Sequence, residues 1–195
     1  PERISAMFRR AFNEMRTGRP GPVVLELPRD VMAAEVPEAA QNYIAAKTGK
    51  FLPPQSDIES AVDALLNAKR PLIWSGQGVL MGAASESLTE LAELAGIPVM
   101  TTMPGKSGFN ETHPLSLGAT NLTYSGQARK WLDESDVVFA VGTSMTGTHY
   151  GQRPPDGKTL IHCSADPSDI NRDYDIDMPL PGDAKLVLDA MIEIA

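Results

Sequence analysis

The first apolar pattern along the chain has the period of an amphipathic helix. Apolar residues recur at intervals of three and four over residues 4–15, and Gly18 follows them. This spacing places the apolar side chains on one helix face, and a glycine commonly follows a helix end. The short apolar run Val23–Leu27, closed by Pro28, predicts a strand. From residue 33 to 54 the chain has no period, which predicts a linker.

From Ser56 onward, helical patterns alternate with short runs in which nearly every residue is apolar. Ser56–Glu59 has the pattern of a capping box at the start of a helix. Gly96 is predicted to follow a helix end and Asp183 to cap a helix start. The predicted strands cover residues 71–74, 97–100, 137–141 and 159–162, and the later predicted helices cover residues 82–95, 125–134 and 183–194.

Strands that are apolar throughout are buried on both faces, which is typical of a parallel sheet covered by helices. The alternation of strands and helices predicts an α/β fold, a doubly wound sheet in three αβα layers with right-handed crossovers. The length of 195 residues suits one sizeable domain with an appendage. A helix and one strand cannot bury their own apolar faces, so we expect the first segment to have been covered by something else.

The composition of the chain argues against several classes of binding partner. A net charge of −8 argues against a nucleic-acid or anionic-membrane surface, because either would need clustered Lys and Arg. The single cysteine, Cys163, excludes an internal disulfide and fits a reducing, cytoplasmic compartment. No apolar run approaches the ~20 residues of a membrane span. The chain starts at Pro1 and stops within an apolar helical pattern, so we expect it to be a piece of a longer protein.

Glycine-bearing turns after the predicted strands are the main candidate for ligand chemistry. Gly76-Gln77-Gly78 and Gly142 follow two of the runs, at the sheet edge where such folds bind ligands. Glycine there either lets backbone amides approach a phosphate or only permits a tight turn. A nicotinamide site is poorly matched, because the glycine spacing is one residue too long and no acidic residue follows Thr102.

Other kinds of catalytic site are not supported. The segment around Ser144 lacks the glycine that a nucleophile elbow needs two residues after the serine, so we interpret Ser144 as a turn hydroxyl. His162 lies in a predicted strand, so we interpret it as a core histidine. Cys163 beside it is interpreted as an inert buried thiol. The acidic run from Asp173 to Asp177 imitates an EF-hand but lacks its glycine and glutamate. The residues therefore predict no nucleophile, no acid–base pair and no metal site.

Seven segments, in order, resemble thiamine-diphosphate-dependent enzymes of the acetolactate synthase type. They include a "GRPGPV" stretch near the start, a "PVMTT" stretch with a following "GKSG", and a "PGDA" stretch before the last helix. The segments lie at residues 18–31, 70–79, 98–108, 113–118, 136–142, 161–170 and 181–184.

The resemblance implies a domain organisation. Residues 1–32 would be the C-terminal helix-strand remnant of a pyrimidine-binding domain, 33–55 a linker, and 56–195 the central domain with a six-stranded parallel sheet of the FAD/NAD-binding type. The catalytic glutamate and the motif that holds Mg²⁺ and thiamine diphosphate would belong to the pyrimidine- and diphosphate-binding domains of the parent chain. The parent would be a homodimer or homotetramer. The fragment alone would then be inactive and bind neither thiamine diphosphate nor Mg²⁺.

The resemblance also marks positions where some family members bind FAD or ADP. The positions that match those contacts are Arg19, Gly76, Gln77, Gly78, Thr101, Thr102, Gly118, Asp166 and Asp183. Two departures weaken the expectation of a nucleotide: Thr143 stands near the place of a flavin-contacting arginine, and Ser164 replaces an acid. Each lost charged hydrogen bond is worth ~1.5–3 kcal/mol.

Two other functions are alternatives to a scaffold domain. The chain could be a FAD- or ADP-binding module that acts by binding alone. A sirtuin-like deacylase on a related fold is disfavoured, because the sequence has neither a zinc-binding cysteine set nor a catalytic histidine motif. The substrate of a parent enzyme is not encoded in these residues.

Overall fold

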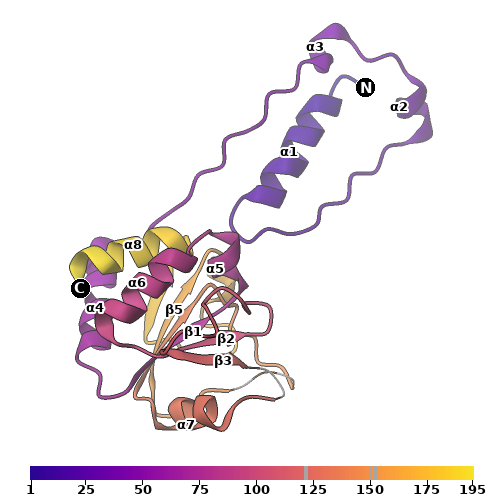
Figure 1. Cartoon of the computed structure of the whole chain (residues 1–195). Helices are drawn as coiled ribbons and strands as arrows, with labels where there is room; N and C mark the ends of the chain where they lie inside the picture. Colours follow the sequence, from indigo (N-terminus) through magenta and orange to yellow (C-terminus); the bar gives the residue numbers. More distant parts are fainter. Residues whose placement is uncertain (121–122, 150, 152) are drawn as a thin grey trace. The chain divides into compact units, whose positions relative to one another are not determined.

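The computed structural model describes residues 1–120, 123–149, 151 and 153–195. Its internal contacts divide the chain into two compact units, Pro1–Lys50 and Phe51–Ala195. Figure 1 shows a helix with long connecting segments in the first unit and a sheet with helices in the second. The finer division predicted at residues 32 and 55 stays a prediction.

The first unit contains three helices, α1 (Ile4–Arg16), α2 (Arg29–Ala33) and α3 (Glu38–Gln41). The helix predicted over residues 4–15 is confirmed, and Gly18 follows its end with a φ of +65°. The predicted strand at Val23–Leu27 is wrong, because these residues have no strand structure and Val24 is 86% exposed. A strand needs a neighbour for its backbone hydrogen bonds, and no described segment supplies one here.

The second unit is a six-stranded, wholly parallel sheet in the order β3-β2-β1-β4-β5-β6. This confirms the predicted fold class. The strands are β1 (Pro71–Ser75), β2 (Val99–Thr102), β3 (Ser116–Thr120), β4 (Val137–Val141), β5 (Thr159–Ser164) and β6 (Met178–Pro181). The helices are α4 (Gln55–Leu66), α5 (Gln77–Met81), α6 (Ser85–Ala95), α7 (Gly126–Glu134) and α8 (Ala184–Ile194), with the short 3₁₀ helix η1 (Pro167–Asp169) after β5.

Helices cover both faces of this sheet (Figure 1). Helices α4, α6 and α8 lie on one face, where Ile73, Phe139 and Ile161 belong to the larger buried cluster. Helix α7 lies on the other face, where its Leu132 packs in a smaller cluster with strand residues such as Val138. Burial on both faces explains why the four central strands are mainly apolar.

Local start and stop signals were partly correct. Asp183 caps α8 by accepting hydrogen bonds from two backbone amides, and Gly96 ends α6 with a φ of +64°. The predicted capping box is wrong: Pro54 precedes α4, no side chain caps it, and Ser56 lies inside the first turn. The helix predicted over residues 82–95 begins later, at Ser85, because Ala83 has a φ of +54° that interrupts helical geometry. The short helix α5 before it was not predicted.

No helix within the described ranges is both long enough and apolar enough to cross a membrane.

Candidate functional site

The candidate site lies at the carboxyl ends of the strands, where the strand order reverses. The chain proceeds from β1 outward through β2 to β3, and then returns to place β4 on the other side of β1. In doubly wound sheets such a reversal separates the following loops and leaves a crevice between them, which is the usual ligand position. Here the two loops concerned are those after Ser75 and after Val141.

Four glycines pack against one another at this reversal. A Cβ on Gly76 would lie 2.3 Å from the carbonyl oxygen of Gly142, and a Cβ on Gly78 would lie 2.7 Å from the Gly142 Cα. A Cβ on Gly105 would lie 2.7 Å from the carbonyl carbon of Gly76. Gly142 itself has a φ of +62°. The absent side chains therefore allow backbone to contact backbone.

The amides of the predicted phosphate-binding turn have partners within the protein. The Gly76 N–H donates to the carbonyl of Val141 at 2.9 Å, and the Gly78 N–H donates to the carbonyl of Gly142 at 2.7 Å. Gln77, between them, is exposed. Of the two explanations for these glycines, tight geometry therefore has direct structural support.

Two of the remaining predicted site residues lie at the end of β2 and one on β3. Thr101 is 3% exposed, and its hydroxyl has no hydrogen-bond partner in the described structure. The Thr102 hydroxyl accepts from the Gly105 amide at 3.1 Å. Gly118 lies within β3, opposite Met100, with a φ of +82°.

The two predicted carboxylates follow β5 and β6 and hold local backbone. Asp166 accepts from the amide of Ser168 at 3.0 Å and from its hydroxyl at 2.7 Å. Asp183 accepts from the amides of Lys185 and Leu186 at 3.1 and 3.3 Å. Both side chains thus begin the helix that follows them.

Arg19 belongs to the other unit, Pro1–Lys50, where it is exposed. The structure therefore gathers Gly76, Gln77, Gly78, Thr101 and Thr102 around β1 and β2, and leaves the role of all nine residues in nucleotide binding a prediction.

Sequence reasoning missed Arg172, which lies three residues after Asp169. Its guanidinium donates to the Asp169 carboxylate at 2.7 Å and to the carbonyl of Ser144 at 3.2 Å, and it also contacts the Thr146 hydroxyl. The three-residue spacing from Asp169 was the only sequence signal. The contact with the loop after β4 depends on the fold. The Ser144 hydroxyl is hydrogen-bonded to the Thr146 hydroxyl at 2.8 Å.

Two buried residues of β5 carry titratable groups. Nε2 of His162 lies 2.8 Å from the carbonyl oxygen of Thr143, and since a carbonyl only accepts, Nε2 carries the proton. Burial lowers the pKa of His162, and its Nδ1 has no partner in the described structure. Burial likewise raises the pKa of the Cys163 thiol to about 12. Both groups are therefore uncharged near pH 7, as expected for residues of a core strand.

Two carboxylates of the acidic run after β5 also accept hydrogen bonds from backbone amides. Asp173 accepts from the Gly147 amide at 3.0 Å, and Asp177 accepts from the Leu160 amide at 2.8 Å. Among the residues that the structure describes, no group of three or more His, Cys, Asp or Glu side chains could hold a metal ion.

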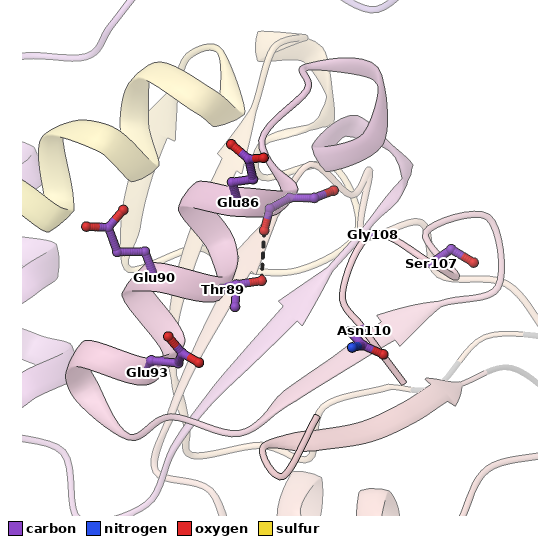
Figure 2. Close-up of a pocket in the computed structure, with 8 residues that line it drawn as sticks. Glu86, Thr89, Glu90, Glu93, Ser107, Gly108 and Asn110 are labelled. Atoms are coloured by element: carbon purple, nitrogen blue, oxygen red, sulfur yellow. Dashed lines mark hydrogen bonds between the residues drawn. The ribbon is translucent and has the colours of Figure 1, made fainter. Parts of the chain in front are cut away.

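A groove along α6 lies apart from the predicted residues. Figure 2 shows Glu86, Glu90 and Glu93 on the helix and Ser107 and Asn110 on the loop after β2. Glu93 also bonds to His113 at 3.0 Å. The carboxylates make this lining acidic, which opposes the binding of a phosphate-bearing ligand.

Known proteins resemble nearly the whole of this chain. A probable acetolactate synthase large subunit from Methanococcus aeolicus is 36% identical over 97% of the chain. Glyoxylate carboligase from Escherichia coli O157:H7 is 33% identical over 98% of it. The chain spans about a third of the length of these curated relatives.

Solved structures agree on the fold. A putative thiamin diphosphate-dependent enzyme from Mycobacterium smegmatis superposes with a TM-score of 0.82 at 25% identity, over 99% of this chain and 37% of its own. Benzoylformate decarboxylase from Polynucleobacter necessarius has the same TM-score at 24% identity, over 100% of this chain and 36% of its own, and supports the fold alone. Residues 58–191 match the family described as thiamine pyrophosphate enzyme, central domain. The chain therefore belongs to the thiamine pyrophosphate enzyme family, and the sheet with its helices is the central domain of that family.

Proposed function

We propose that this chain supplies the non-catalytic central domain of a thiamine-diphosphate-dependent 2-oxo-acid decarboxylase or carboligase of the acetolactate synthase type. The observation that carries the proposal is the match of residues 58–191 to the central domain of the family. Relatives along nearly the whole chain include acetolactate synthases and a glyoxylate carboligase.

The use of the polar groups in the second unit supports a structural role. Its buried thiol is held in the protonated form, and its buried histidine in the neutral form. The carboxylates of Asp166 and Asp183 hold helix starts. A catalytic acid, base or nucleophile has to reach a substrate atom, whereas these groups face their own backbone.

Thiamine diphosphate and Mg²⁺ would be held by the pyrimidine- and diphosphate-binding domains of the parent protein, which are its proposed partners. The exposed apolar face of α1 supports such partners, because Met7 and Phe8 are 40% and 36% exposed and the helix has no buried residue. An apolar stripe of this kind is stable when another element covers it.

The test is an activity assay on the 195-residue chain with pyruvate or glyoxylate, thiamine diphosphate and Mg²⁺. We expect no release of carbon dioxide above the rate without protein. Glyoxylate carboligase of Escherichia coli, assayed with glyoxylate in parallel, serves as the positive control. Turnover by the chain that persists after repurification would refute the non-catalytic role.

A further inference from the structure

One arginine joins the loops that follow β4 and β5. Arg172 lies in the loop after β5, which we call the β5 loop (residues 165–177). One terminal nitrogen of its guanidinium donates to Asp169 at 2.7 Å. The other donates to the carbonyl of Ser144 at 3.2 Å and to the hydroxyl of Thr146. Ser144 and Thr146 belong to the loop after β4, which we call the β4 loop (residues 142–149), so the guanidinium spans the two loops.

The carboxylate that anchors Arg172 is itself fixed. The Asp169 side chain is 3% exposed, and its second oxygen accepts a hydrogen bond from Ser164 at 3.0 Å. Ser164 is the last residue of β5, so the anchor is tied to the sheet. A charged pair with one partner buried is screened less by salt than a pair on the surface. The ion pair is therefore held in place by the bond between Asp169 and Ser164.

Two further bonds join the same loops. Asp173 accepts from the Gly147 amide at 3.0 Å, and His162 donates to the Thr143 carbonyl at 2.8 Å. With the two contacts of Arg172, residues 143, 144, 146 and 147 of the β4 loop are each bonded to a side chain from β5 or its loop. Four residues in the first half of the connection between β4 and β5 are thus held by side chains of β5 and its loop.

These bonds lie at the carboxyl edge of the sheet, beside the β1–β4 reversal where a nucleotide would be expected. A bound nucleotide needs donors and acceptors that face it, but the amides of Gly76 and Gly78 donate to backbone of β4 and its loop. The carboxylate of Asp166 accepts twice from Ser168. The closely packed glycines contact protein backbone rather than leaving room for a phosphate.

We propose that Arg172 and its anchor Asp169 take the structural place of a bound nucleotide in this domain. The pair holds the β4 and β5 loops together at the carboxyl edge of the sheet, and the domain keeps its shape without FAD or ADP. The inference rests on the proposed function only for the identity of the domain. Its tests measure loop opening and nucleotide binding, so their outcome is independent of any turnover by the chain or its parent.

The first test compares amide hydrogen exchange in the full chain and two variants, Arg172→Ala and Arg172→Lys. Loss of a charged hydrogen bond should speed exchange of the Gly147 and Ser168 amides by about tenfold or more in Arg172→Ala. Arg172→Lys has one head group that cannot span both loops, so it should show a smaller acceleration, and it carries the test if Arg172→Ala does not fold.

The control is Arg129→Ala, because Arg129 pairs with Asp133 within α7 and has a similar exposed fraction, 46% against 36% for Arg172. Exchange in the two loops should be unchanged in this variant. Exchange in both Arg172 variants within about twofold of the wild-type rate would overturn the proposal, since RT ln 2 is smaller than the contribution of one hydrogen bond.

The second test is thermal unfolding of the wild-type chain with FAD or ADP added at about 1 mM. A nucleotide bound with a Kd a hundredfold below its concentration would raise the Tm by roughly 5–11 °C. We expect shifts within about 1 °C of zero for both nucleotides, which at about 1 mM nucleotide corresponds to a Kd of about 1 mM or weaker. A saturable rise in Tm with either nucleotide, or a chain that purifies with bound flavin, would overturn the proposal.

Discussion

Ser87 on α6 donates its hydroxyl proton to Asp189 on α8 across an oxygen-to-oxygen distance of 2.5 Å. Lys185, one turn before Asp189, contacts both residues at 3.0 to 3.2 Å. Ser87 is 5% exposed, whereas the side chains of Lys185 and Asp189 are each 42% exposed. The three side chains therefore form a polar bridge between two helices that share one face of the sheet.

Replacement of Ser87 by Ala should weaken this bridge. The variant loses a hydrogen bond to a charged group but gains helix propensity and leaves Asp189 its bond to Lys185, so the free energy of unfolding should fall by about 0.5–1.5 kcal/mol. Urea unfolding measures the change. Ser60→Ala is the control, because among the described residues the Ser60 hydroxyl bonds to the Ser56 carbonyl, within α4. A loss in Ser87→Ala no larger than in Ser60→Ala would contradict the bridge.

The glycine contacts at the strand reversal predict a larger effect. In Gly78→Ala the new Cβ would lie 2.7 Å from the Gly142 Cα, and the backbone on both sides is fixed by hydrogen bonds. The free energy of unfolding should fall by roughly 2–3 kcal/mol, as in other overpacked sites. Gly126→Ala is the control, because a Cβ at that helical position meets nothing within 4 Å. Equal stability of the two variants in urea unfolding would show that the loops after β1 and β4 separate without cost.

The four central strands could be predicted from the sequence because burial on both faces gives each of them a run of apolar residues. The two edge strands could not. β3 contains serine, glycine and threonine, and most of its residues are only partly buried. Edge strands need fewer apolar residues, so their sequences carry a weaker signal.

The sequence of β6 argued against a strand, because Pro179 and Pro181 lack backbone N–H groups. The prolines alternate along β6 with residues whose backbone N–H groups point toward β5. The amide of Gly182, for example, donates to the Ser164 carbonyl of β5 at 2.9 Å. Both prolines therefore turn their nitrogens toward the open edge, where no hydrogen bond is lost.

The site was predicted less completely than the fold. The sequence located the glycine turns, but only the fold shows that Gly76 and Gly78 meet Gly142, more than sixty residues away. The contact between Arg172 and Ser144 depends in the same way on β4 and β5 being neighbours. Local patterns encode turns and caps, whereas contacts between loops depend on strand order.

Cys163 should be unreactive while the protein is folded. The thiol is fully buried, and burial raises its pKa to about 12, so the thiolate that attacks alkylating reagents is almost absent at pH 8. Iodoacetamide labelling followed by mass spectrometry should show no adduct in buffer and complete labelling in denaturant. Rapid labelling of the native chain, at a rate near that of the denatured chain, would mean that the end of β5 opens readily.

The hydrogen bonds of the Asp136 carboxylate predict that the free energy of unfolding depends on pH. Its carboxylate accepts from the backbone amides of Lys69 and Arg70 at 2.8 and 2.9 Å, which joins the start of β4 to the turn before β1. Slight burial acts to raise the pKa of Asp136, but the backbone hydrogen bonds from Arg70 and Lys69 oppose it and leave the pKa lowered.

A lowered folded-state pKa means that the unfolded chain binds the proton more tightly. The contribution of Asp136 is therefore present above its unfolded pKa of ~3.9 and is lost as the pH falls through the lower folded value.

The free energy of unfolding of Asp136→Asn should be lower than that of the wild type by roughly 1–3 kcal/mol at pH 7, because the amide accepts one bond and directs an N–H group at the second donor. Asp63→Asn, an exposed change on α4, is the control. Urea unfolding at pH 7 and at ~pH 3 should show the difference between wild type and Asp136→Asn shrinking on acidification. A difference that is constant between the two pH values would mean that the charge of Asp136 does not stabilise the join between the two strands.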